Sequence, residues 1–289
     1  MPSSVGIFYF SGTGVTKLIS DEIKSKFMNE NYNVELFSIE EILKNKNFSI
    51  KNDFDLIGFG FPVHALNAPR IFYKFLNILP KTDNKKSFLF KTAGDFFMNG
   101  GTTKEIKQLL RKKGYNVAYE ELFIVASNLG IRLSNNLYKK LFETSKFQIN
   151  TMVEDINKGK TKLVKENLIF TIISIVFSSF ESIGTKFLKL HFRVKSNCTK
   201  CNKCVNLCPQ NNISMKNNKI TFDWHCIACL RCIYNCPQKS IKLPPFNAFL
   251  FDSFDINQIL SKKKDNIDNS SKELRFKKYI DKIISSKKD

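Results

Sequence analysis

The sequence is short of acidic residues, histidine and tryptophan, and it has no cysteine outside residues 198–236. It contains 26 Asp and Glu against 46 Lys and Arg, which gives a formal net charge of +20. All eight cysteines lie in that one segment, and nothing at Met1 resembles a signal peptide. Both observations argue against a secreted chain held together by disulfides. We therefore expect a reducing, cytoplasmic setting.

The eight cysteines form two runs with the same spacing. Residues 198–209 read Cys-x2-Cys-x2-Cys-x3-Cys-Pro, and residues 226–237 repeat this pattern. Such runs hold two [4Fe–4S] clusters, and the fourth cysteine of each run ligates the other cluster. This rule predicts two ligand sets: Cys198, Cys201, Cys204 and Cys236 for the first cluster, and Cys226, Cys229, Cys232 and Cys208 for the second. Zinc is the weaker alternative, because zinc sites usually take ligands from two separated Cys-x2-Cys pairs.

The repeat extends beyond the cysteines, at the constant offset of 28 residues that separates Cys208 from Cys236. Cys-Pro-Gln-Asn-Asn-Ile at 208–213 matches Cys-Pro-Gln-Lys-Ser-Ile at 236–241. Residues 195–245 resemble the bacterial two-cluster ferredoxins. The resemblance implies a small α+β domain with two [4Fe–4S] clusters, oxygen-sensitive and suited to an anaerobe.

Positive charge within the ligand loops departs from this resemblance, since many ferredoxins of this type are acidic. Lys200, Lys203 and Arg231 lie between the cysteines. Positive charge beside a cluster should raise its potential and favour an acidic redox partner. Nucleic acid is the rival explanation for a basic chain. The sequence shows no nucleic-acid motif and no basic–aromatic platform, so we expect no nucleic-acid binding.

A glycine-rich loop follows the first apolar run at 5–10, and a helical pattern follows the loop. The loop reads Ser11-Gly12-Thr13-Gly14-Val15-Thr16. Glycines let a phosphate approach the backbone, and amide N–H groups, hydroxyls and the helix dipole favour its charge. The loop has no Walker lysine and no Gly-x-Gly-x-x-Gly fingerprint. It resembles the phosphate loop of the flavodoxins, although glycine-rich turns also occur without a ligand.

Two further loops follow buried strands expected at 56–60 and 87–90, and helices are expected at 70–79 and 102–113. Ligands of open parallel sheets bind at the carboxyl ends of the strands. Residues 3–160 resemble the flavodoxins, which implies an α/β doubly wound parallel sheet that binds FMN. The resemblance places the flavin between two sets of residues: Pro62, Val63, His64 and Ala65 on one side, and Thr92, Gly94, Asp95 and Asn99 on the other.

The side chains expected around the flavin ring leave alternatives open. His64 lies where a proton donor to flavin N5 could lie, but a solvated or hydrogen-bonded side chain is the ordinary interpretation. Phe96 or Phe97 could stack on the ring or belong to the core. The Trp and Tyr stackers of small flavodoxins are not obvious, because the single Trp is Trp224.

An apolar segment lies between the two expected domains. Within 166–190, polar residues recur every three to four positions, as in a helix with a narrow polar stripe: Thr171, Ser174, Ser178, Ser182 and Thr185. We favour a buried helix that packs the domains together. Contact with a membrane surface and a membrane span are the alternatives. A span would separate flavin from clusters and place Glu181 inside the bilayer.

These patterns divide the chain into four parts: a flavodoxin-like domain at 1–160, an apolar connector at 161–194, a ferredoxin domain at 195–245 and a basic tail at 246–289. We expect the tail to end in a solvated helix that docks weakly, and a basic membrane-surface helix or a partner-docking arm is the less favoured alternative. The whole resembles flavodoxin–ferredoxin fusions of anaerobes, which implies electron transfer between FMN and two [4Fe–4S] clusters. The alternatives are a flavin-dependent reductase of a small acceptor and a ferredoxin with a flavin-free docking or sensor domain.

Overall fold

The computed structural model describes residues 3–45, 53–95, 103–130, 132–164, 168–262 and 270–285. Within these residues the larger unit contains a five-stranded parallel sheet with the order β2-β1-β3-β4-β5. Its strands are β1 (Ser4–Tyr9), β2 (Asn33–Ser38), β3 (Leu56–Pro62), β4 (Lys85–Ala93) and β5 (Tyr115–Ile124). This is the flavodoxin-like strand order, so the predicted fold class is confirmed.

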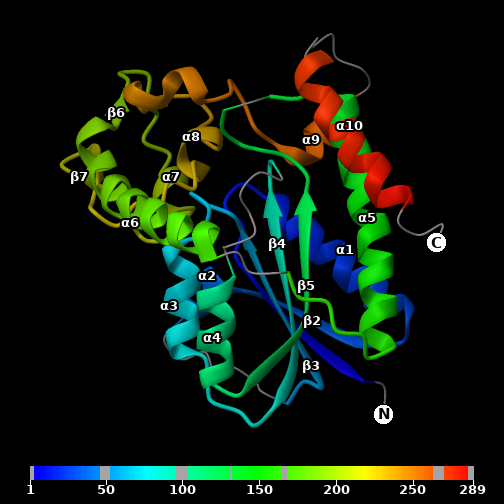
Figure 1. Cartoon of the computed structure of the whole chain (residues 1–289). Coiled ribbons are helices and arrows are strands. Elements are labelled where there is room, and N and C mark those ends of the chain that lie inside the picture. Colours follow the sequence, from blue (N-terminus) through cyan, green and yellow to red (C-terminus); the bar gives the residue numbers. More distant parts are fainter. Residues whose placement is uncertain are drawn as a thin grey trace.

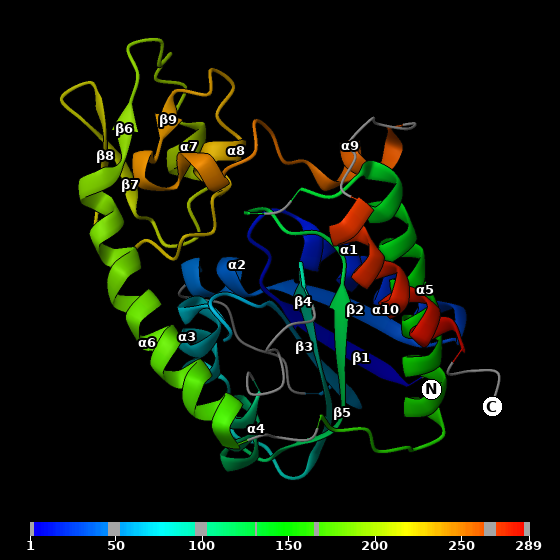
Figure 2. The ribbon, with the colours of Figure 1, turned by 45° about the horizontal axis from the view of Figure 1, so that its top comes forward.

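Helices cover both faces of the sheet (Figures 1 and 2). One face carries α1 (Val15–Asn29) and α5 (Asn135–Asn157), and the other carries α2 (Ile39–Lys44), α3 (Arg70–Ile78) and α4 (Lys104–Lys112). The central strands are buried on both sides, which is why β3 reads as a nearly continuous apolar run. The helices expected at 70–79 and 102–113 both form, with ends shifted by at most two residues.

The smaller unit is built from two similar halves. Strands β6 (Arg193–Val194) and β9 (Ile241–Lys242) pair antiparallel, as do β7 (Ile213–Lys216) and β8 (Lys219–Phe222). Each half contains one short helix, α7 (Lys203–Asn206) or α8 (Arg231–Tyr234). Left-handed backbone recurs at the 28-residue offset at three pairs of positions: Lys200 and Ala228, Asn202 and Leu230, Asn211 and Lys239. The sequence repeat is therefore also a repeat of backbone conformation.

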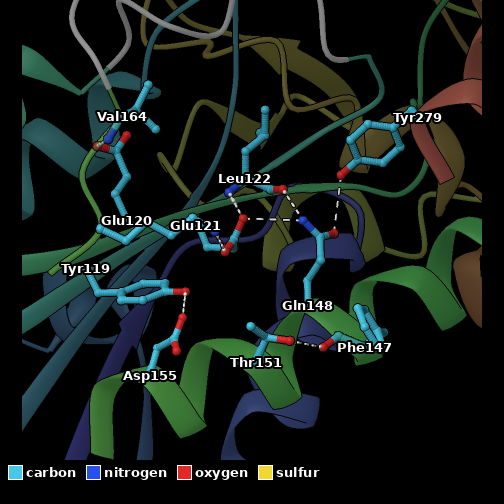
Figure 3. Close-up of polar contacts among 11 residues, drawn as sticks. Tyr119, Glu120, Glu121, Leu122, Phe147, Gln148, Thr151, Asp155, Val164 and Tyr279 are labelled. Carbon is cyan, nitrogen blue, oxygen red and sulfur yellow. Dashed lines mark hydrogen bonds and ion pairs between the residues drawn. The ribbon is translucent and has the colours of Figure 1, made fainter. Parts of the chain in front are cut away.

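The tail packs into the larger unit, so the expectation of a solvated, weakly docked helix is wrong. After a 3-10 turn, η2 (Pro244–Phe249), come α9 (Ile256–Ser261) and α10 (Ser270–Ser285), both against α5. Five tail residues are buried in the core beside α1 and α5: Phe254, Ile256, Ile259, Phe276 and Ile280. Tyr279 donates to Gln148 Oε1 at 3.2 Å, and Gln148 donates in turn to Glu121 on β5 (Figure 3).

The connector forms α6 (Leu168–His191), which runs along the outer edge of the molecule beside α3 (Figure 2). Its polar stripe faces the protein, and most of its large apolar side chains are exposed. The favoured expectation of a buried apolar connector is therefore wrong. Among the described residues, one segment, Phe170–His191, is long and apolar enough to cross a membrane. Length and composition alone are weak evidence for a span.

Candidate cofactor sites at the domain interface

The eight cysteines line two separate pockets of the smaller unit. One pocket contains Cys198, Cys201, Cys204 and Cys236, and the other contains Cys208, Cys226, Cys229 and Cys232. This grouping matches the two ligand sets expected from the crossover rule, and ligation itself stays a prediction. Among the described residues, no three His, Cys, Asp or Glu side chains are arranged for a single metal ion. A [4Fe–4S] cluster instead takes four cysteine thiolates spread around it.

The environment of the sulfur atoms fits an iron–sulfur cluster. Backbone N–H groups donate to sulfur from Asn212 to Cys208 at 3.2 Å, and from Ser240 to Cys236 at 3.3 Å. Such bonds stabilise thiolates and tune a bound cluster. Burial raises the pKa of the Cys226 thiol to about 12 and that of Cys229 to about 11. Thiolates here therefore need a compensating positive charge, which cluster iron would supply.

The second pocket adjoins the predicted phosphate loop. The smaller unit lies beyond the carboxyl ends of the strands (Figure 1). A Cβ atom added to Gly12 would lie 3.3 Å from the carbonyl oxygen of Cys229 and 3.4 Å from its Cβ atom. The loops expected to hold the two kinds of cofactor are thus in van der Waals contact. The first pocket faces outward, where Cys201 is exposed.

Arg231 joins the two units at this contact. Its guanidinium forms a bidentate ion pair with Glu40, with both N···O distances at 2.7 Å. It also donates to the carbonyl oxygens of Gly12 at 2.9 Å and Ser11 at 2.5 Å. We expected this charge to act on a cluster potential. The structure pairs it with a carboxylate, so its clearest role is to fix the phosphate loop against the second cysteine loop.

The predicted phosphate loop borders a cavity of about 430 Å³. Gly14 adopts the left-handed conformation, with φ of 99°, immediately before α1, and Val15 begins that helix. Glycine at this position lets the backbone turn so that the N-terminus of α1 is presented to the cavity. The side chains of Ser11 and Thr13 also line the cavity. Backbone, hydroxyls and helix end fit a phosphate group, whereas the carboxylates of Glu41 and Asp255, which also line the cavity, oppose its charge.

Two predicted threonines have a different position from the one expected. The hydroxyl groups of Thr16 and Thr92 are buried and hydrogen-bonded to each other at 2.8 Å. They join α1 to β4 beneath the loop. The Thr92 side chain does not line the cavity in which the flavin ring is expected. Thr13 instead accepts a hydrogen bond at 3.1 Å from Asn128, in the loop after β5. Sequence reasoning missed Asn128 because this loop has no glycine-rich signature.

A second cavity, of about 400 Å³, lies where the flavin ring is expected. Four predicted residues line it: Val63, Ala65, Gly94 and Asp95. Pro62 ends β3 and pairs with Thr92 of β4, so it supports the first of these loops. Gly94 has to be glycine, because an added Cβ would lie 2.4 Å from the Cβ of Ser127. Asn99, Phe96 and Phe97 lie outside the described residues.

The remaining walls of this cavity come from segments that sequence reasoning did not connect with it. They include Ser127, Leu129, Phe177 of α6, and Arg275 and Phe276 of α10. Arg275 forms an ion pair with Asp95. No spacing rule could have found this pair, since 180 residues separate its members.

The His64 side chain lies at the interface between the two units and does not line the ring cavity. Its backbone closes a tight turn with Asn67, with N···O distances of 2.7 and 2.8 Å. Its side chain is hydrogen-bonded to the backbone of Ile227, in the second cysteine loop. Burial lowers the pKa of His64 to about 4, so the imidazole is neutral at pH 7. The expected role as a donor to flavin N5 is not supported by this position.

The fold and the pockets define a class: a flavodoxin-like domain joined to a ferredoxin-like domain. The family profile of the 4Fe–4S dicluster domain matches residues 191–237. Together they show a flavodoxin-like fold followed by a 4Fe–4S dicluster domain.

Individual relatives are distant. An uncharacterized protein of Methanocaldococcus jannaschii is 31% identical over 106 residues, which is 37% of this chain and 61% of that protein. The chain therefore spans less than two thirds of this relative. A flavodoxin from the domain Archaea is 16% identical and covers 53% of this chain and 99% of its own, with a TM-score of 0.37. Flavodoxin 1 from Bacillus cereus is 18% identical and covers 53% of this chain and 98% of its own, with a TM-score of 0.38. The fold assignment rests on strand order.

Proposed function

We propose that this chain transfers electrons between an FMN in the flavodoxin-like domain and two [4Fe–4S] clusters in the ferredoxin-like domain, in anaerobic redox metabolism. The contact between Gly12 and Cys229 is the observation that carries the proposal. When bound, the flavin would exchange electrons singly or in pairs and each cluster one at a time. Holding both in one chain gives them a high effective concentration.

The residues of the chain would bind and orient the cofactors. The Ser11–Gly14 loop and the N-terminus of α1 would hold the phosphate, and Val63, Ala65, Gly94 and Asp95 would border the ring. Arg231 keeps the phosphate loop and the second cysteine loop in register through four hydrogen bonds to Glu40, Ser11 and Gly12. Ile227 is 4% exposed and belongs to the core cluster on the face of the sheet that α2, α3 and α4 cover, which excludes water from the contact.

The position of the two pockets supports an order of transfer. The second set of cysteines lies against the flavodoxin-like domain, and the first set faces solvent. A redox partner would therefore meet the first cluster, and electrons would pass through the second cluster to or from the flavin. Lys200 and Lys203 are exposed beside Cys201. Two cations at this docking point would favour an acidic partner and speed its association.

Cofactor content after strictly anaerobic purification tests the proposal. We expect about one FMN and about eight iron atoms per chain, the iron count following from two [4Fe–4S] clusters. Stopped-flow mixing with a reductant should then show cluster bleaching and flavin reduction linked by a shared rate constant. Iron without FMN, even after reconstitution, would leave a ferredoxin with a docking domain. Rapid turnover with a quinone or nitro compound alone would favour a reductase.

A further inference from the structure

Helix α6 has the reverse of the orientation usual for a surface helix. Its polar side chains Thr171, Ser174 and Thr185 are at most 7% exposed. Seven large apolar side chains on the opposite face are between 46% and 72% exposed: Ile172, Ile175, Val176, Phe180, Ile183, Phe187 and Leu190. Phe170 and Phe177 are exposed as well, but they lie on the side of the polar residues, and Phe177 lines the ring cavity. A surface helix normally buries its apolar stripe. A continuous apolar ridge of this size marks an interaction site in a folded protein.

Hydrogen bonds fix the polar side of α6 to the flavodoxin-like domain. Ser178 accepts a bond from Asn67 at 3.2 Å, and Thr185 accepts one from Arg70 at 3.0 Å. Arg70 also donates to the carbonyl oxygen of Cys226 at 2.5 Å, which ties the helix to the second cysteine loop. The apolar ridge therefore cannot turn inward without breaking contacts that hold both domains. No residue among those that the structure describes covers this ridge.

Basic residues follow the ridge along the chain. From Lys186 to Lys195 the sequence has four basic residues and no acidic one: Lys186, Lys189, Arg193 and Lys195. Trp224 is 39% exposed and packs edge-on against Phe187, with ring centroids 5.8 Å apart. Lys189 lies over the Trp224 ring at 4.7 Å and within 3.9 Å of Asp223. Tryptophan beside lysine and an apolar helix is typical of segments that lie in the interface of a bilayer.

We propose that α6 docks this protein on the surface of an anionic lipid bilayer, with the apolar ridge in the acyl boundary and the basic residues among the headgroups. The charge of the protein favours an anionic bilayer over a second copy of the chain as the partner of this ridge. A chain of net charge +20 repels a second copy of itself, whereas anionic lipid attracts each basic residue near its surface. A span is inconsistent with the polar side of α6 bonded to the flavodoxin-like domain. The proposal does not depend on the flavin assignment.

Vesicle flotation of the anaerobically purified full chain tests this docking. We expect binding to phosphatidylcholine vesicles that contain phosphatidylglycerol, weaker binding to phosphatidylcholine alone, and release by alkaline carbonate. Phe180→Asp and, separately, Ile183→Asp should each lower vesicle affinity by about 10-fold or more. Each variant places a charge where the wild type inserts an apolar side chain into the bilayer. The matched control is Met28→Asp, a 51% exposed position on α1 on the opposite face of the sheet. It should bind like the wild type.

A second measurement reports the location of the helix directly. Trp224 is the only tryptophan of the chain, so brominated acyl chains should quench its fluorescence in the wild type and much less in Phe180→Asp. Iron content and melting temperature of each variant show that it is folded. Four results would each overturn the proposal: no binding by the wild type, wild-type affinity in both α6 variants, retention after carbonate, or a wild-type dimer that Phe180→Asp dissociates.

Discussion

The two halves of the ferredoxin-like domain share cysteine spacing and backbone conformation, yet one is buried against the flavodoxin-like domain and the other is exposed. All seven positions between the cysteines differ between the halves, and at three of them the second-half residue contacts the flavodoxin-like domain. Given as first-half and second-half residues, these three are Thr199 and Ile227, Lys203 and Arg231, and Asn206 and Tyr234. The cysteines thus define where a cluster can form, and the residues between them decide which cluster meets the other domain.

The largest expected effect comes from removing one cysteine from each half. Cys201→Ser and Cys229→Ser should each lower the iron content from about eight to about four atoms per chain, because one cluster is lost. Cys201→Ser should still show electron exchange between the remaining cluster and the flavin, whereas Cys229→Ser should lose it. Iron analysis and stopped-flow absorbance measure both. If both variants lost electron transfer between cluster and flavin equally, the second cluster could not be the one that exchanges electrons with the flavin.

Arg231→Ala should have the next largest effect, and Lys203→Ala is its matched control. Removing Arg231 leaves Glu40, which is 17% exposed, without its bidentate partner and two loop carbonyls without a donor. We expect a loss of about 3 kcal/mol in the free energy of unfolding, near the lower bound for a buried pair. Lys203→Ala should change it by less than about 0.5 kcal/mol. Anaerobic denaturant titration measures both values, and similar losses would contradict the role given to Arg231.

Ile227→Ala tests the apolar part of the same contact against Thr199→Ala. Ile227 is buried in the core cluster of the flavodoxin-like domain, whereas Thr199 is exposed. Truncation of Ile227 should cost about 2 kcal/mol through lost transfer energy and an unfilled cavity. Thr199→Ala should be nearly neutral. The midpoint of thermal unfolding gives the comparison, and an unchanged midpoint for Ile227→Ala would show that the two domains are not packed as described.

Tyr234→Phe should give the smallest effect. The Tyr234 hydroxyl donates to the carbonyl oxygen of Asn128 and accepts from the amide of Phe251 at 3.3 Å. Phenylalanine keeps the ring and removes both bonds, which should cost about 1 kcal/mol. Because Asn128 also bonds Thr13, FMN affinity should fall slightly as well. Asn206→Ala is the control in the exposed half, and its FMN dissociation constant, measured by fluorescence, should match the wild type.

Local patterns in the sequence predicted the parts of the structure that short segments determine. The cysteine spacing predicted which four thiols share a pocket, and the alternation of apolar runs with glycine-rich loops predicted the sheet. Helical periodicity in α6 showed that Thr171, Ser174 and Thr185 share a face. It could not show which face turns inward, because that depends on partners such as Asn67 and Arg70 in a distant loop and helix.

The tertiary contacts between distant segments could not be predicted, because they too depend on partners far away in the sequence. His64 was expected at the flavin because its loop follows β3, but the docked cysteine loop draws its side chain to Ile227. Arg275 and Phe276 read as part of a basic, solvated tail until their positions beside Asp95 are known. Residues whose neighbours are far away in the chain carry no local signature of their environment.

The ion pair between Asp95 and Arg275 has a consequence for how the protein is made. Synthesis proceeds from the amino terminus, so the cysteine loops leave the ribosome before α10 does. The wall that Arg275 and Phe276 contribute to the ring cavity is therefore the last to be added. A chain that stops before residue 270 lacks this wall of the ring cavity. On the proposed function, a flavin would be enclosed on this side only after α10 has been synthesised.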